Sequence, residues 1–152
     1  MIIYIYSGFC YFVDGTWKGS DKFSGTRWFC TSSNVQSPTM GAANIRKSLS
    51  PLHTEFKALL WGMKFMIGAD NQDVAFFKDY SELVKMVSYP TERPTFLAYL
   101  DDFQSDKEEF TSFSLYLISR NVNVKADNLA RKVRTEPLHV TYVNNFPQHW
   151  LF

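Results

Sequence analysis

The chain has 152 residues, enough for one domain with a sizeable core. Apolar residues make up 45% and charged residues 20%, a balance that excludes an intrinsically disordered chain. The formal net charge of +1 lacks the basic excess of a stand-alone nucleic-acid-binding protein, so such binding would need a local patch or a second domain.

The N-terminal stretch, residues 1–8, has no basic region and is too short to cross a bilayer. We interpret it as an N-terminal extension. Cys10 and Cys30 are widely spaced and form no CxxC motif, which favours buried thiols over a disulfide or a zinc site. These features predict an intracellular protein, in the nucleus or cytoplasm, with no membrane partner.

Three strands open the domain. Residues 9–17, 23–32 and 39–48 are separated by short polar turns, which predicts an antiparallel meander. A helix then begins at Ser50-Pro51, because Ser is a good N-cap and Pro suits the first helical position. Apolar residues spaced three and four apart continue the helix to about residue 67.

The second half alternates between the two kinds of element. The pattern predicts a strand at 73–77, a helix at about 80–88, an acidic amphipathic helix at 95–109 and a strand at 112–119. A last helix begins near Asn123, a plausible N-cap, and ends in a basic turn at 131–134. The domain would therefore span residues 9–134, and residues 135–152 would form a C-terminal tail that packs on it.

Four acids lie at unexpected places in these elements: Asp14 in an apolar strand, Glu55 at the edge of a core-facing helix stripe, Asp79 after a strand, and Asp127 at a helix start. Each also has a local explanation. Asp-Gly is a strong turn signal, so Asp14 could end its strand. A helix N-terminus favours an acid such as Glu55 or Asp127. Asp79, with a glutamate three residues later, resembles a capping box.

The combination is harder to explain locally. The predicted order of strands and helices can bring the four acids to one end of a sheet, where they would repel one another unless a cation lay between them. Hard carboxylate ligands favour Mg²⁺ or Mn²⁺ over softer metals. A cluster that holds two such ions can hydrolyse phosphodiester bonds.

The motifs that carry these acids resemble the ribonuclease H type 1 domain, and within it the reverse-transcriptase-like branch of plant non-LTR retroelements. The matching stretches are VDGTW at 13–17, SPLHTEFKALLWGM at 50–63, FFKDYSELVKMV at 76–87 and LISRNVNVKADNLAR at 117–131. The last stretch is the most specific. The resemblance implies an α/β, ribonuclease H-like fold: a five-stranded mixed sheet, strands one to three antiparallel, with helices on both faces.

The resemblance also implies an endonuclease that cleaves the RNA strand of RNA–DNA hybrids with two ions of Mg²⁺ or Mn²⁺. Asp14 would contact both ions, Glu55 and Asp79 would complete one metal site, and Asp127 would complete the other. Gly15 and Asn123 would lie near the nucleic acid. Further domains of a longer retroelement polyprotein are a second predicted partner.

Three departures favour an alternative, a catalytically weak or inactive retroelement-derived binding or scaffold module with the same fold. Residues 119–126 lack the histidine that many type 1 enzymes carry there. Residues 88–111 hold two basic residues against six acidic ones, so hybrid binding would be weak. Lys78 stands where the family usually has a small polar residue, and its ammonium either pairs with Asp79, in competition with a metal, or points to solvent.

A nuclease of this fold with another substrate, such as an exonuclease or a recombinase, is a third option.

Overall fold

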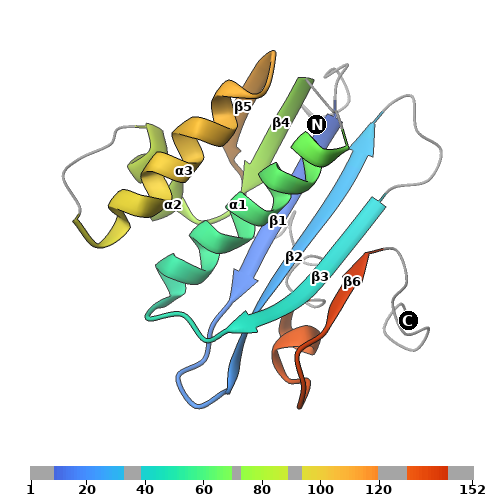
Figure 1. The fold of residues 1–152 in the computed structure, drawn as a ribbon, viewed down its shortest axis with the longest axis vertical. Coiled ribbons are helices and arrows are strands. Elements are labelled where there is room, and N and C mark those ends of the chain that lie inside the picture. Colours follow the sequence, from blue (N-terminus) through green and yellow to red (C-terminus); the bar gives the residue numbers. More distant parts are fainter. Residues whose placement is uncertain (1–8, 33–38, 70–72, 89–93, 120–129, 144–152) are drawn as a thin grey trace.

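The computed structural model describes residues 9–32, 39–69, 73–88, 94–119 and 130–143 (Figure 1). These residues form a mixed sheet with the strand order β5-β4-β1-β2-β3-β6. Three helices, α1, α2 and α3, contribute to a shared core cluster on one face of the sheet. The element order matches the order predicted from the sequence, from the first strand to the fifth.

The first half is the predicted antiparallel meander. It consists of β1 (Phe9–Thr16), β2 (Phe23–Ser32) and β3 (Thr39–Arg46). β1 pairs with β2, and β2 pairs with β3, both in antiparallel register. In this register Val13 lies opposite Trp28, and Asp14 lies opposite Arg27.

The second half adds parallel strands beside β1. The helix α1 (Pro51–Gly68) leads to β4 (Asp73–Lys78), which pairs with β1. After it come α2 (Ser81–Ser88), a 3₁₀ turn (Pro94–Phe96), α3 (Leu97–Glu108) and β5 (Ser112–Leu117), which pairs with β4. Parallel strands need such crossover helices.

The register of β1 and β4 brings two acids to the same end of the sheet. Phe12 of β1 pairs with Phe77 of β4, so Asp14 and Asp79, which lie two positions further along, are neighbours there.

The helix α1 supplies most of the helical side of the core. Its start is the predicted one: Ser50 is the N-cap, and its side chain accepts a hydrogen bond from the His53 backbone N–H. Its apolar face, which includes Phe56, Leu59 and Met63, is fully buried in the core cluster with residues of β1, β2 and β4. This packing presses α1 against β1, beside the strand end that carries Asp14.

A second apolar cluster and a helical stretch lie on the opposite face of the sheet. Strand alternation turns Cys10, Phe12 and Phe77 toward this face, where they form a second apolar cluster with Ala75. A helical stretch at 130–134 lies against β2, with the Ala130 carbonyl beside Gly25. Helices therefore cover both faces, as the resemblance implied.

Within the described residues the sheet already has six strands, one more than predicted. β6 (Thr141–Val143) pairs with β3 at the sheet edge, so the expectation of five strands was wrong. The buried Asn44 on β3 holds the approach to this strand. It accepts a hydrogen bond from the Val140 N–H at 2.7 Å and donates one to the Leu138 carbonyl at 2.8 Å. A three-residue strand is too short to show an alternating pattern in the sequence.

The surface of α3 is acidic, as its sequence indicated. Asp101, Asp102, Glu108 and Glu109 are all exposed at or just after this helix, whereas Phe103 packs into the core. Within the ranges given above, no helix combines the length and apolar character needed to span a bilayer.

Candidate active site

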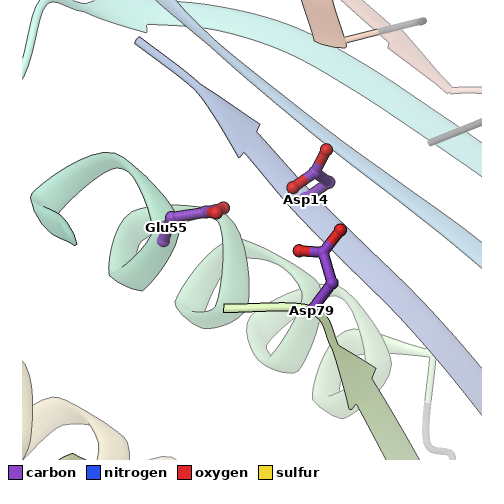
Figure 2. Close-up of side chains that lie close together, drawn as sticks. All are labelled: Asp14, Glu55 and Asp79. Atoms are coloured by element: carbon purple, nitrogen blue, oxygen red, sulfur yellow. The ribbon is translucent and has the colours of Figure 1, made fainter. Parts of the chain in front are cut away.

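Three of the four predicted acids converge at one end of the sheet (Figure 2). Asp14, Glu55 and Asp79 each offer a carboxylate oxygen, and these oxygens lie within 4.8 Å of one another. They come from β1, α1 and the residue that follows β4, so the fold brings together acids distant in the sequence. Asp127 and Asn123 lie outside the described residues, and their roles remain predictions.

The local alternatives do not explain these three positions. Asp14 is paired within β1, whose strand continues to Thr16, so it does not begin a turn. Glu55 is 4% exposed and lies beyond the first turn of α1, so it is not a rim residue held by the helix dipole. The helix α2 begins at Ser81, which places Asp79 one residue too early for its N-cap.

The backbone of Gly15 connects β1 to α1 through a hydrogen bond. Its backbone N–H donates a hydrogen bond of 2.6 Å to Oε1 of Glu55. A Cβ at this position would lie 2.9 Å from that oxygen and 2.9 Å from Cγ2 of Thr54, closer than carbon atoms approach their neighbours. The glycine is therefore required for the close approach of β1 and α1 that positions Glu55.

The ammonium of Lys78 lies among the three carboxylates. Its Nζ is 2.7 Å from Oε1 of Glu55, 3.4 Å from Oδ1 of Asp14 and 3.8 Å from Oδ1 of Asp79. It also donates a hydrogen bond of 3.1 Å to the Val13 carbonyl. The lysine side chain has no exposed surface. Of the two orientations that the sequence left open, the lysine takes the one that faces the acids.

Burial and charge act against each other on these groups. Burial acts to lower the pKa of Lys78, but Glu55 and Asp14 outweigh it, so the pKa of this ammonium is raised and the lysine stays charged. Burial raises the pKa of Glu55, whereas Lys78 and the Gly15 N–H act to lower it. Removing Lys78 would leave the buried carboxylates without the cation that they share, and breaking a buried pair in this way typically costs about 3–5 kcal/mol.

Arg27 supplies a second buried cation, which we did not single out in the sequence. It lies opposite Asp14 in the β1–β2 pair and is 2% exposed. Burial lowers the pKa of Arg27 to about 10, and the charge of Asp14 opposes that change. An arginine in a strand is ordinarily a solvent-facing residue, so only the pairing register identifies it.

A pocket of about 500 Å³ opens beside the acids. Its walls include Gly15, Glu55 and Tyr80 on the acid side and the basic residues Lys18, Arg131 and Arg134. Arg134 is held in place by Asp21, with 2.9 Å between Nε and Oδ2, and by a hydrogen bond to the Thr16 hydroxyl. The pocket therefore places positive charge next to the carboxylates, an arrangement suited to a phosphate group.

Comparison with known proteins identifies the family. The family model described as reverse transcriptase-like matches residues 12–133, which is most of the chain. This chain belongs to the reverse transcriptase-like family. A search of curated proteins gave no match.

Solved structures that share the fold of this reverse transcriptase-like domain include RNase H structures. RNase H1 from the halophilic archaeon Halobacterium salinarum matches with a TM-score of 0.73 and 18% identity, over 82% of this chain and 96% of that one. The N-terminal RNase H domain of a Mycobacterium tuberculosis protein, solved as a fusion with maltose-binding protein, matches with a TM-score of 0.73 and 18% identity, over 83% and 92%. An RNase H1 isolated from compost, in complex with an RNA/DNA hybrid, matches with a TM-score of 0.70 and 18% identity, over 83% and 96%. The domain thus has the RNase H type 1 fold.

The carboxylates of this reverse transcriptase-like domain suit a hard divalent cation. Mg²⁺ and Mn²⁺ prefer oxygen ligands, and the cluster offers three oxygens that face one another. Oδ1 of Asp79 is buried and accepts no hydrogen bond from the described residues, so it is the oxygen best placed to take a further ligand. The ammonium of Lys78 lies within 3.8 Å of each of these carboxylates.

Proposed function

We propose that this domain is an endonuclease that cleaves the RNA strand of RNA–DNA hybrids by metal-dependent hydrolysis. The observation that carries the proposal is the convergence of Asp14, Glu55 and Asp79 at one end of the sheet. The RNase H fold, and a structural neighbour solved with an RNA/DNA hybrid, support the choice of substrate. Within this proposal the 2′-hydroxyl of RNA marks the strand to be cut.

In this proposal each group has a separate task. Asp14, Glu55, Asp79 and Asp127 would hold two divalent ions, Mg²⁺ or Mn²⁺, which when bound activate a water molecule and stabilise the leaving oxygen. Gly15 keeps the Glu55 carboxylate in place through its backbone N–H.

The basic side of the pocket, with Lys18, Arg131 and Arg134, would hold the phosphates of the hybrid beside the acids. Asn123 would contact the nucleic acid at the start of the last helix. With a formal net charge of +1, the domain would bind the hybrid through this local patch and not through its overall charge.

The test is cleavage of an end-labelled RNA–DNA hybrid across separate titrations of Mg²⁺ and Mn²⁺. We expect internal cuts in the RNA strand, no cuts in a DNA duplex, and loss of cleavage in the Asp79→Asn variant. Asp101→Asn is the matched control, because Asp101 is an exposed acid on α3, a helix that contributes nothing to the cluster. A hybrid left uncut at every metal concentration would refute the nuclease proposal.

One observation favours a second candidate, a binding or scaffold module that does not cut. The Lys78 ammonium lies among the carboxylates, so the acids are neutralised in part without a metal ion. A module of this kind would bind the hybrid equally well in Mg²⁺ and in EDTA, as measured by fluorescence anisotropy, and Asp79→Asn would not weaken the binding. Binding without cleavage would decide for this candidate.

A further inference from the structure

The direction of the Lys78 side chain follows from its place in β4. Side chains alternate along a strand, and Val74 and Phe76 point into the core on the α1 face of the sheet. Lys78, two residues further on, points to the same face at the strand end. There the apolar core gives way to Glu55 of α1, so the lysine extends toward the acids and not toward solvent.

The surroundings of the ammonium are those of a cation site. An ammonium has three donors and no acceptor, and all four oxygens near Nζ are acceptors: one from each carboxylate and the Val13 carbonyl. The lysine side chain is entirely buried, so water does not compete for these donors. The same three carboxylates are those that the acids would present to a divalent ion.

An ammonium and a divalent ion cannot share this position. Two cations a few Å apart in a buried site repel strongly, and the repulsion is only partly screened there. When all three carboxylates are ionised they carry three negative charges, of which Lys78 compensates one. Arg27, opposite Asp14, lies close enough to interact with that carboxylate electrostatically. The cluster is therefore largely neutralised by the chain's own side chains.

We propose that Lys78 is a built-in counter-ion that takes the place of a divalent ion between Asp14, Glu55 and Asp79. It follows that the domain folds without metal and that divalent ions bind weakly to these three acids. The inference rests on the proposed metal site, but it concerns the occupancy of that site and not cleavage. If the domain cuts hybrids, it does so only at a high metal concentration.

The test compares Mn²⁺ binding to the wild-type protein and to the Lys78→Thr variant by titration calorimetry and by Mn²⁺ electron paramagnetic resonance. We expect the variant to bind Mn²⁺ at least about tenfold more tightly, because a positive charge beside the ion has been removed. Lys64→Met is the matched control. Lys64 is an exposed lysine whose ammonium pairs with Asp106 of α3, and its loss should leave Mn²⁺ binding unchanged. Equal Mn²⁺ affinity of the wild type and Lys78→Thr would overturn the proposal.

Thermal unfolding of the wild-type protein provides a second measurement that does not depend on the folding of a variant. We expect the same melting temperature in EDTA and in millimolar Mn²⁺, since a ligand stabilises a protein only when its concentration exceeds its dissociation constant. A large increase in melting temperature at micromolar Mn²⁺ would contradict the counter-ion role. For Lys78→Thr we expect a lower melting temperature in EDTA, which Mn²⁺ restores.

The cleavage assay separates this inference from the proposed function. If Lys78→Thr gains Mn²⁺ affinity but no protein form cuts a hybrid, the counter-ion role stands and the nuclease proposal fails. If the wild type cuts at micromolar Mg²⁺ and binds Mn²⁺ as tightly as Lys78→Thr, the nuclease proposal stands and the counter-ion role fails.

Discussion

Asp14 and Arg27 lie directly opposite each other in the β1–β2 pair, and both are almost completely buried. Residues opposite each other in an antiparallel pair point to the same face of the sheet. The two side chains therefore share the face opposite α1, whereas Lys78 reaches the Asp14 carboxylate from β4. Asp14 therefore interacts electrostatically with two buried cations, Lys78 and Arg27.

We expect Arg27→Met to lower the free energy of unfolding by about 1–3 kcal/mol, because it leaves the buried Asp14 carboxylate with one cation fewer, although Lys78 remains beside it. Urea denaturation measures the change. Arg46→Met, at the exposed end of β3, is the matched control and should change the free energy by less than about 0.5 kcal/mol. If the two variants were equally stable, Arg27 would have no role in neutralising the cluster.

The fold was largely predictable because its periodic signals are strong. Alternation in the first three strands, and the three-and-four spacing of α1, each point to a single secondary structure. Asp14, Glu55 and Asp79 were predictable as a group for a different reason. Asp14 and Glu55 break the apolar patterns of their elements, Asp79 directly follows a buried strand, and the order of the elements brings the three together.

Other features depend on pairings that no local pattern encodes. The sequence pattern predicts that Arg27 is a surface residue, and only the register of β1 and β2 shows that it lies opposite Asp14. The sequence pattern did not determine whether Lys78 points to the acids or to solvent. In the structure, strand alternation places Lys78 on the same face as Val74 and Phe76. The segment before β6 is held by two hydrogen bonds with the Asn44 side chain, which donates to the Leu138 carbonyl and accepts from the Val140 N–H, both far away in the sequence.

Asn44 provides a test of how β6 is held. We expect Asn44→Ala to increase amide hydrogen exchange across residues 138–143, because the variant loses the side-chain bonds to Leu138 and Val140. The loss of each buried partner typically costs about 1–3 kcal/mol. Asn44→Asp retains the acceptor for the Val140 N–H but cannot donate to the Leu138 carbonyl, so its effect should be intermediate if both bonds hold the segment. Exchange confined to β3, with none at 138–143, would argue against this role.

The buried thiol of Cys30 predicts how the stability of the fold depends on pH. Burial raises the pKa of its thiol to about 12, with Cys10 adding to the increase and a hydrogen bond with Thr39 opposing it. In the unfolded chain the thiol ionises near its ordinary pKa of 9.0. Between pH 9 and 12 the unfolded state thus holds fewer protons than the folded state, so stability should fall as the pH rises through this window.

Urea denaturation at a series of alkaline pH values measures this decline, and Cys30→Ala should make it shallower. In the native protein, reaction of Cys30 with a thiol reagent at pH 8 should be no faster than global unfolding, because the side chain is buried. Rapid modification without unfolding would contradict the burial of this thiol.

Gly25 controls the position of the last helix. A Cβ at this residue would lie 2.0 Å from the Ala130 carbonyl oxygen, which is backbone and cannot rotate away. We expect Gly25→Ala to push the helical stretch 130–134 off the sheet and to lower the free energy of unfolding by about 1–3 kcal/mol. Gly68→Ala is the control, since a Cβ there meets no atom of the described residues within 4 Å, and a helical Gly→Ala change is expected to be neutral or stabilising.

Gly25→Ala also tests whether the helical stretch 130–134 can move without disturbing the cluster of Asp14, Glu55 and Asp79. Asp127 lies three residues before Ala130, so a displaced stretch would also carry Asp127 away from its proposed place. The three acids Asp14, Glu55 and Asp79 come from other elements and should stay together. Hydrogen exchange should therefore increase at 130–134 while α1 stays protected, and hybrid cleavage, if present, should fall. A Gly25→Ala protein with normal exchange at 130–134 would show that this contact does not hold the helix.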